Sequence, residues 1–255
     1  MPAAPRAGCS GVVHFLAVPR IAVQLVRSCA LDRNDLVVEF GAGQGAITTH
    51  LAETGAQILA VERDPAFVRK LRNRFREYGN VRVVPADAQV VPLPRRRFSA
   101  VASIPYALST TLLRRLLSPQ HTNLRQAALI VEWGFARRVA AASPRDLEQA
   151  WWSTRFEIRV ASRIPADCFS PPPRVNSAHL VLKRRENVPV RALWTVIAAA
   201  YRNPQRPART VIGHPGVLRV VGIEPAQPAG SVARGRVGRT GQEARRRPQH
   251  ALAPA

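Results

Sequence analysis

The apolar positions of this chain follow two alternating spacings, which predict strands and helices in turn. Short runs made up mostly of apolar residues, typical of strands buried on both faces, lie at residues 35–40, 57–62, 81–85, 98–103 and 127–133. Apolar residues at helical spacing lie between or before them, at 19–30, 46–53, 65–78 and 109–117. Short alternation of this kind is typical of a parallel sheet with helices on both faces. We therefore predict an α/β fold.

The pattern changes in the last third of the chain. Two β-rich runs, 155–164 and 177–184, flank a proline-heavy loop and resemble a terminal antiparallel pair, and residues 190–201 fit one helix. Residues 225–255 are Gly, Pro, Ala and Arg with almost no large apolar side chain. Such a segment cannot bury enough surface to offset its ordering entropy. We predict a disordered basic tail there and a flexible leader at 1–11.

Composition adds a large excess of positive charge. The formal net charge is +22, from 38 Lys and Arg against 16 Asp and Glu, which implies a polyanionic partner such as nucleic acid. Almost all the basic residues are arginines, whose planar donors fit phosphate. GC-rich coding DNA, which favours arginine codons over lysine codons, is the alternative cause of the preference for arginine. The hydrophobic fraction of 46% provides a packed core and argues against global disorder.

Several classes of protein are excluded. Cys9, Cys29 and Cys168 are far apart and lack metal-binding spacing, so we expect buried, reduced thiols and no metal. No stretch reaches the roughly 18 apolar residues of a membrane span. The N-terminus lacks an export signal. We therefore expect a cytoplasmic protein.

A glycine-rich loop follows the strand at 35–40. It reads EFGAGQG, and Gly41, Gly43 and Gly45 allow a sharp turn and close approach to a ligand. A dinucleotide loop has GxGxxG spacing and binds pyrophosphate. The GxGxG spacing here suits a ligand without phosphates, such as the methionine part of S-adenosylmethionine. The alternative is a tight strand-to-helix turn without a ligand.

Acidic residues follow the next two strands. Glu62 lies about 20 residues after the loop, where a carboxylate accepts the ribose hydroxyls of an adenosine. Asp64 before Pro65 is the better helix cap, which leaves Glu62 for the ligand. Asp87 can accept a hydrogen bond from an adenine amine, although alone it fits a turn. Three such signals at three consecutive strand ends predict an S-adenosylmethionine site.

The loop after residues 98–103 has the residues needed to methylate an amine. The lone pair of an adenine amine is delocalised into the ring, and acceptors for its hydrogens direct that lone pair at a methyl group. The segment Ser103-Ile104-Pro105-Tyr106 offers a backbone carbonyl fixed by proline, a side-chain oxygen, and a ring that can stack on a flipped base. Catalysis would then be mainly positioning, with no strong general base.

With its continuation ALST, this loop resembles the N-I-P-Y-x-(I/L)-S-T motif of rRNA adenine dimethyltransferases. Other segments are similar to the family's N-F-L, E-F-A-x-R and F-x-P-x-P-x-V-(D/N)-S motifs: His14-Phe15-Leu16, residues 135–138 and residues 169–178. The resemblance covers roughly residues 12–185 and is closest to the Erm branch. That branch methylates an adenine in the peptidyl-transferase loop of 23S rRNA and confers macrolide, lincosamide and streptogramin B resistance.

The resemblance implies a Rossmann-like class I methyltransferase with a mostly parallel seven-stranded sheet. It implies a catalytic domain at 12–186, a small, degenerate helical region at 187–224, and the tail at 225–255. It also implies S-adenosylmethionine as methyl donor, large-subunit ribosomal RNA as partner, and a monomer. The cofactor-binding residues it implies are His14, Leu16, Gly41, Gly43, Glu62, Asp87 and Ser103. The catalytic and base-binding residues it implies are Ser103, Ile104, Pro105, Tyr106 and Phe169.

The chain departs from the family at two of these positions and near its end. Ser103 and His14 stand where the family has asparagine, and the loss of a carbonyl acceptor at 103 favours mono- over dimethylation. Alternatively, His14 is structural and Phe169 only pins the proline loop. The Arg/Gly/Pro-rich sequence at 225–255 replaces the expected last helix, which favours a truncated or frame-shifted end.

Three other functions stay open. The sister branch dimethylates adjacent adenines near the 3′ end of small-subunit rRNA. A non-catalytic nucleic-acid-binding protein would not need Gly41, Glu62, Asp87 and Tyr106 together, and the charge disfavours a small-molecule or protein methyltransferase.

Trp151 and Trp152 favour core packing over base stacking. Candidate RNA contacts, with solvated faces as the alternative, are Arg114, Arg115, Arg137, Arg138 and Arg174.

Overall fold

The computed structural model describes residues 14–119, 121–212, 218 and 224–231, so the predicted leader and most of the predicted tail lie outside it. The strands are β1 (Phe15–Leu16), β2 (Leu36–Phe40), β3 (Gln57–Glu62), β4 (Val81–Pro85), β5 (Phe98–Ser103), β6 (Leu124–Glu132), β7 (Phe156–Ile164), β8 (Phe169–Ser170) and β9 (Ser177–Arg184). The α-helices are α1 (Pro19–Ser28), α2 (Ala46–Ala52), α3 (Pro65–Arg74), α4 (Ser109–Leu117), α5 (Trp133–Val139), α6 (Leu147–Arg155), α7 (Val190–Arg202), α8 (Ala208–Ile212) and α10 (Ala229–Ser231).

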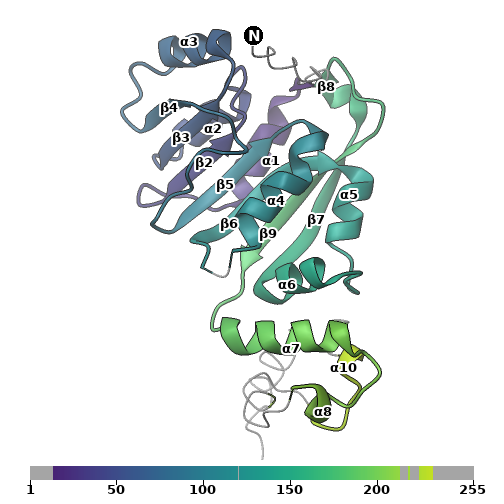
Figure 1. Ribbon diagram of the computed structural model, residues 1–255. Helices are drawn as coiled ribbons and strands as arrows, with labels where there is room; N and C mark the ends of the chain where they lie inside the picture. Colours follow the sequence, from purple (N-terminus) through teal and green to yellow (C-terminus); the bar gives the residue numbers. More distant parts are fainter. Residues whose placement is uncertain (1–13, 120, 213–217, 219–223, 232–255) are drawn as a thin grey trace, which may run out of the picture. The chain divides into compact units, whose positions relative to one another are not determined.

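Seven strands form one sheet in the order β4-β3-β2-β5-β6-β9-β7 (Figure 1). The pairs from β4 to β6 are parallel, and β9 runs antiparallel to β6. This confirms the predicted mostly parallel seven-stranded α/β fold. The chain moves outward from β2 to β4 and then returns to β5 on the other side of β2. In open α/β sheets, ligands bind at the carboxyl ends of the strands beside such a reversal.

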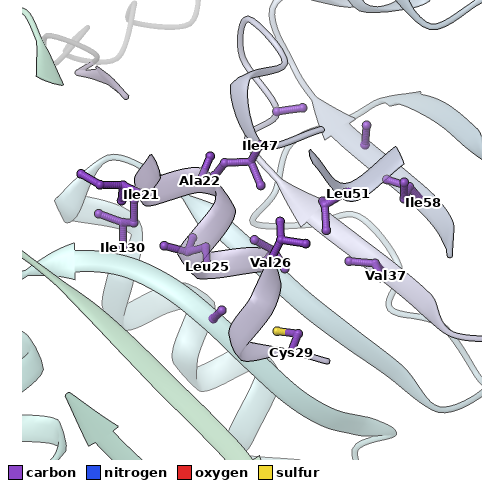
Figure 2. Packing of buried hydrophobic residues seen from close by; sticks show 14 of the residues in the cluster. Ile21, Ala22, Leu25, Val26, Cys29, Val37, Ile47, Leu51, Ile58 and Ile130 are labelled. Atoms are coloured by element: carbon purple, nitrogen blue, oxygen red, sulfur yellow. The ribbon is translucent and has the colours of Figure 1, made fainter. Parts of the chain in front are cut away.

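Helices cover the sheet because each buries one apolar face. Figure 2 shows α1 and α2 residues packed with side chains of the sheet, among them Ile21, Leu25, Ile47, Leu51, Val37, Ile58 and Ile130. In α4 the leucines at 112, 113, 116 and 117 are buried on one face, and the helix lies in front of the sheet in Figure 1. The helical spacing read from the sequence therefore identified the buried faces.

The contacts divide the chain into two compact units, Met1–Arg138 with Ile158–Lys183, and Val139–Glu157 with Arg184–Ala255. In the second unit α6 packs on α7, and α7 packs on α8 and α10. The Trp151 and Trp194 rings meet edge to face at 5.0 Å, and the Arg155 guanidinium lies 4.5 Å from the centre of the Trp151 ring. Trp151 and Trp152 are buried, which confirms core packing. The predicted domain boundaries stay predictions.

The end of α3 and the presence of α6 are among the local features that differ from the expectation. The helix predicted over 65–78 ends at Arg74, because Phe75 leaves helical geometry and buries its ring. Helix α6 was not predicted, although Asp146 caps it by accepting from the Gln149 N–H at 2.8 Å. Asp followed three residues later by Gln is a capping-box pattern, so the sequence did carry that signal.

The structure also bears on the excluded classes. Among the described residues, no helix has the length and apolar character of a membrane span. Within the same residues, no group of His, Cys, Asp or Glu could hold a metal ion. Cys29 and Cys168 are free and buried, as expected, while Cys9 lies outside the described part of the chain. Burial raises the pKa of Cys29 to about 12, so its thiol stays protonated and unreactive.

Candidate active site

The glycine loop between β2 and α2 depends on left-handed backbone conformations. Gly41, Gly43 and Gly45 have φ values of +73°, +53° and +84°, which residues other than glycine rarely adopt. The loop crosses the end of β3, where the Gly41 and Ala42 N–H groups donate to the Val61 carbonyl at 2.9 and 3.0 Å. A Cβ at Gly43 would lie 3.3 Å from the Phe15 ring. The glycine loop therefore leaves a narrow space for a ligand, lined by backbone atoms, at the carboxyl ends of β2 and β3.

Glu62, at the end of β3, joins the glycine loop to the start of α3. Its Oε2 accepts the Gly43 N–H at 2.8 Å, and its Oε1 accepts the N–H groups of Arg63 and Asp64, each at 2.8 Å. The residue is 8% exposed. Asp64 caps α3 by accepting the Ala66 N–H at 2.7 Å, as predicted. The Glu62 carboxylate thus has a fixed orientation at the edge of the cavity.

Asp87 lies in the loop that follows β4. Its Oδ1 accepts the Gln89 N–H at 2.7 Å, and its Oδ2 lies 3.5 Å from the Arg63 guanidinium. Arg115 of α4 donates to the Ala88 and Val91 carbonyls of the same loop. Arg115, which the sequence gave as a candidate RNA contact, therefore holds the loop that carries Asp87 in place.

A cavity of about 220 Å³ opens between these strand ends. It is lined by all seven residues predicted to bind the cofactor, namely His14, Leu16, Gly41, Gly43, Glu62, Asp87 and Ser103. Ile104 and Pro105 also line it. These residues lie in five separate segments of the sequence, and the fold brings them around one cavity.

Glu39 also lines this cavity, although the sequence analysis gave it no role. It is 1% exposed and accepts the Thr48 hydroxyl at 2.6 Å. Burial raises the pKa of Glu39 to about 8, and the charge of Glu62 acts in the same direction. The sequence feature that could have identified Glu39 is an acidic residue inside an otherwise apolar strand.

Replacement of Glu39 by glutamine is expected to change how stability depends on pH. The folded-state pKa of about 8 exceeds the ordinary value of 4.5, so the stabilisation is complete below about pH 4.5 and is lost as pH rises through 8. The Glu39→Gln variant keeps a neutral side chain, and its melting temperature should fall less than that of the wild type between pH 5 and pH 8. Equal falls in a thermal-melting series would contradict the pKa shift.

The catalytic-loop candidate follows β5. Ser103 and Ile104 line the cavity, and Tyr106 begins a 3-10 turn just beyond Pro105. The Tyr106 hydroxyl lies 2.6 Å from the Ser177 Oγ. Ser177 is fully buried at the start of β9. Ser177 had no predicted role, because a contact between residues 71 positions apart has no local signal in the sequence.

The segment that carries His14 is bound to the proline loop. Phe15 pairs with Ser170 and Leu16 with Phe169 in the antiparallel β1–β8 ladder, and the Ala17 N–H donates to the Cys168 carbonyl at 2.9 Å. His14 lies 2.7 Å from the Pro171 carbonyl through Nδ1. Since a carbonyl only accepts, Nδ1 carries the proton in this contact.

Phe169 is not among the residues that line the cavity. It is 5% exposed and belongs to the core cluster that contains Ile21, Ile164 and Cys168. Its burial fits the alternative in which the ring pins the proline loop. Contact of this ring with a target base stays a prediction.

The remaining candidate RNA contacts lie on the surface. Arg114, Arg137, Arg138 and Arg174 are exposed, and the Arg138 guanidinium is 3.9 Å from the Glu132 carboxylate. Glu132 caps α5 by accepting the N–H groups of Gly134 and Phe135. Contact of these arginines with RNA stays a prediction.

Comparisons with known proteins agree with this arrangement. The chain is 29% identical over 177 residues to an rRNA adenine N-6-methyltransferase of Bacillus licheniformis, a match that covers 69% of the chain and 62% of that relative. It is 33% identical over 218 residues to a ribosomal RNA small subunit methyltransferase A of Rubrobacter xylanophilus, covering 81% of the chain and 80% of the relative. The matched region thus spans less than two thirds of the Bacillus relative.

Solved structures support the fold. The crystal structure of the 23S rRNA methyltransferase ErmE superposes with a TM-score of 0.69 and 22% identity, covering 86% of this chain and 94% of ErmE. The sequence model of the family described as "Ribosomal RNA adenine dimethylase" matches residues 12–212, which include the glycine loop, the S-I-P-Y loop and the proline loop. The chain therefore belongs to the ribosomal RNA adenine dimethylase family.

Proposed function

We propose that this protein transfers a methyl group from S-adenosylmethionine to N6 of an adenine in the peptidyl-transferase loop of 23S rRNA, which gives resistance to macrolide, lincosamide and streptogramin B antibiotics. The observation that carries the proposal is that one cavity is lined by Glu62, Asp87 and the first three residues of the S-I-P-Y loop, Ser103 to Pro105. We further propose that it acts as a monomer in the cytoplasm, where ribosomal RNA is found.

The residues of the cavity fit S-adenosylmethionine. Gly41 and Gly43 leave room for a ligand against the backbone, and Glu62 holds a carboxylate at the end of β3, where ribose hydroxyls are bound in folds of this kind. Asp87 lies at the next strand end and can accept from the adenine amine. When bound, the donor supplies a methyl group carried on a positively charged sulfur.

The S-I-P-Y loop supplies the groups that position the amine. Pro105 restrains the backbone beside the Ile104 carbonyl, which accepts one amine hydrogen, and the Ser103 hydroxyl accepts the other. The amine nitrogen would then direct its lone pair at the methyl carbon and form the new carbon–nitrogen bond while the methyl–sulfur bond of the donor breaks, with its electron pair left on the sulfur. The nitrogen would pass its surplus proton to water. Rate acceleration comes mainly from this orientation.

Methylation of defined RNA fragments tests the proposal. The purified protein is incubated with radiolabelled donor and either a large-subunit peptidyl-transferase-loop RNA or a small-subunit 3′-end RNA. Primer extension locates a dimethylated base, and mass spectrometry of nuclease fragments locates a monomethylated base, which does not stop the primer. Modification of the first RNA, with macrolide resistance in cells that express the gene, supports the proposal. Mass spectrometry of the product tests whether Ser103 favours monomethyladenine, and mostly dimethyladenine would count against that expectation.

Small-subunit rRNA is the second candidate substrate. The Rubrobacter relative is a ribosomal RNA small subunit methyltransferase A, and its match extends over 218 residues, against 177 for the Bacillus relative. A primer-extension change confined to the small-subunit fragment would select this alternative and reject the 23S target.

Removal of the Tyr106 ring is expected to weaken catalysis without unfolding the protein. Loss of one base–aromatic stack costs about 1–3 kcal/mol, so Tyr106→Ala should lower kcat/KM for RNA by about 5- to 150-fold. Tyr106→Phe keeps the ring but loses the contact with Ser177, and an intermediate loss is expected. Unchanged RNA kinetics for Tyr106→Ala would remove this residue from the site.

A further inference from the structure

Helix α3 and the two residues after it carry a row of basic side chains that the proposed mechanism does not use. Residues 65–76 contain five basic residues and no acidic residue. The apolar side chains at 68, 71 and 75 are buried. All five basic residues are exposed, namely Arg69, Lys70, Arg72, Arg74 and Arg76. The segment therefore turns an apolar side toward the protein and a positively charged side toward solvent.

Two of these side chains are engaged within the protein. Arg76 pairs with Glu77 at 3.0 Å, and Arg74 donates to the Gln44 carbonyl at 3.1 Å. The other three take part in none of the ion pairs formed among the described residues. The Lys70 Nζ lies 5.8 Å from the centre of the Phe67 ring, a contact that leaves its charge in place. These three, Arg69, Lys70 and Arg72, are called the basic face below.

The stability of α3 explains only part of this charge. Arg72 lies in the last turn of the helix, where a cation is favourable beside the negative end of the helix dipole. That effect is confined to the last turn, so it does not extend to Arg69 and Lys70. Arg69 and Arg72 are three positions apart, a spacing at which like charges repel. The basic face is therefore better explained by a negatively charged partner than by the needs of the helix.

The helix that carries the basic face borders the cofactor cavity. Phe67 of α3 lines that cavity, and a Cβ at Gly45 of the glycine loop would lie 3.0 Å from Leu71 on the buried side of α3. Helix α3 packs on β3 and β4 (Figure 1), the strands that precede Glu62 and Asp87 at the edge of the cavity. An RNA that delivers a base to this edge of the sheet therefore brings its backbone close to the basic face.

We infer that Arg69, Lys70 and Arg72 form a docking surface for the phosphate backbone of the substrate RNA, outside the cavity. This inference rests on the proposed function and adds an RNA-binding surface to it. The planar guanidinium groups fit phosphate oxygens, and the lysine adds a compact positive charge. Contacts to phosphate carry no information about base identity, so the basic face holds and orients the RNA without selecting its sequence.

Two simpler roles of the basic face predict different behaviour. If the three side chains only stabilise the helix, their neutralisation lowers the melting temperature and leaves the salt dependence of RNA binding unchanged. If they act only through the net charge of the protein, loss of any three exposed positive charges has the same effect. A docking surface predicts a change in salt dependence that is specific to this face.

Two triple variants and a control separate these roles. The neutral variant combines Arg69→Gln, Lys70→Gln and Arg72→Gln, because glutamine keeps the helix propensity of the residues it replaces. The charge-conserving variant exchanges arginine and lysine at the same three positions.

The matched control loses the same charge at another place. It combines Arg95→Gln, Arg96→Gln and Arg97→Gln, which are exposed and directly precede β5. They therefore lie at the amino ends of the parallel strands, whereas the cavity lies at the carboxyl ends. Binding of fluorescently labelled large-subunit and small-subunit RNA fragments is measured by anisotropy from about 50 to about 200 mM salt. Calorimetry with the donor and thermal melting accompany each variant.

The neutral variant should show a weaker salt dependence than the wild type on the RNA that the wild type methylates. Each lost phosphate contact lowers the slope of log affinity against log salt by about 0.7–0.9, so three should lower it by about 2–3. Between these salt concentrations, the wild type should then lose about 15- to 60-fold more affinity than the neutral variant. The charge-conserving variant and the control should keep the wild-type slope, and donor affinity should be unchanged in all three.

A wild-type slope in the neutral variant, with or without a lower melting temperature, would overturn the inference while the proposed function stands. Equal losses of slope in the neutral variant and the control would also overturn it, because net charge alone would then explain the binding. If the neutral variant fails to fold, Arg72→Gln alone provides the test, with an expected loss of about one unit of slope. A wild-type protein that methylates neither fragment overturns the proposed function, and this is measured separately from binding.

Discussion

The Glu62→Ala variant is expected to bind S-adenosylmethionine about 100-fold more weakly than the wild type, or worse. A hydrogen bond to a charged group contributes about 1.5–3 kcal/mol, and the carboxylate is proposed to accept from the ribose. Its removal also takes the acceptor from the N–H groups of Gly43, Arg63 and Asp64. The glycine loop then loses its link to α3, so the loss exceeds that of one ligand contact.

Calorimetric titration with the donor measures this effect. Glu62→Gln keeps one acceptor oxygen and should show an intermediate affinity. Glu77→Ala is the control, because the Glu77 side chain is 81% exposed and pairs only with Arg76 among the ion pairs found in the described residues. Donor affinity in Glu62→Ala equal to that of Glu77→Ala would remove Glu62 from the proposed site.

A single added methyl group at Gly45 is expected to destabilise the fold by about 2–5 kcal/mol. The left-handed conformation at φ +84° costs an alanine about 1–2 kcal/mol. The new Cβ would also lie 3.0 Å from Leu71 Cδ2 and 3.1 Å from Phe75 Cε2, and overpacking of a core costs about 1–3 kcal/mol. Both side chains are buried, so they have little room to move.

Thermal melting of Gly45→Ala checks this expectation. For a domain of this size, 1 kcal/mol corresponds to about 2–4 °C, so the melting temperature should fall by roughly 5–20 °C. Gly79→Ala is the matched control, since no atom lies within 4 Å of a Cβ at Gly79 and its φ is outside the left-handed region. Equal melting temperatures for the two variants would show that the loop relaxes without cost.

The parts of the site that the sequence predicted are those with local determinants. A buried strand has an apolar run, a left-handed turn requires glycine, and parallel strands bring their ends to one edge. Gly41, Glu62 and Asp87 could therefore be assigned to one ligand before their distances were known. The cap formed by Asp64 was predicted on the same basis.

The parts that the sequence missed depend on contacts between distant segments. His14 and Pro171 are 157 residues apart, and Tyr106 and Ser177 are 71 apart. No spacing rule relates such pairs. The burial of Phe169 likewise follows from β1–β8 pairing and core packing, whereas the sequence left open whether this ring contacts a base or pins the proline loop. Glu39 was overlooked because its unusual property is a raised pKa. That shift comes from burial, which the residue type alone does not reveal.

The short β1–β8 ladder mechanically links the two proposed substrates. Residues 14–16 line the cofactor cavity, and their partners at 169–171 begin the proline loop. Because β1 and β8 are paired, a donor molecule that displaces β1 is expected to displace β8 as well. RNA that displaces the proline loop is expected to alter the cavity in the same way. Occupancy at one site should therefore alter the departure rate of the ligand at the other.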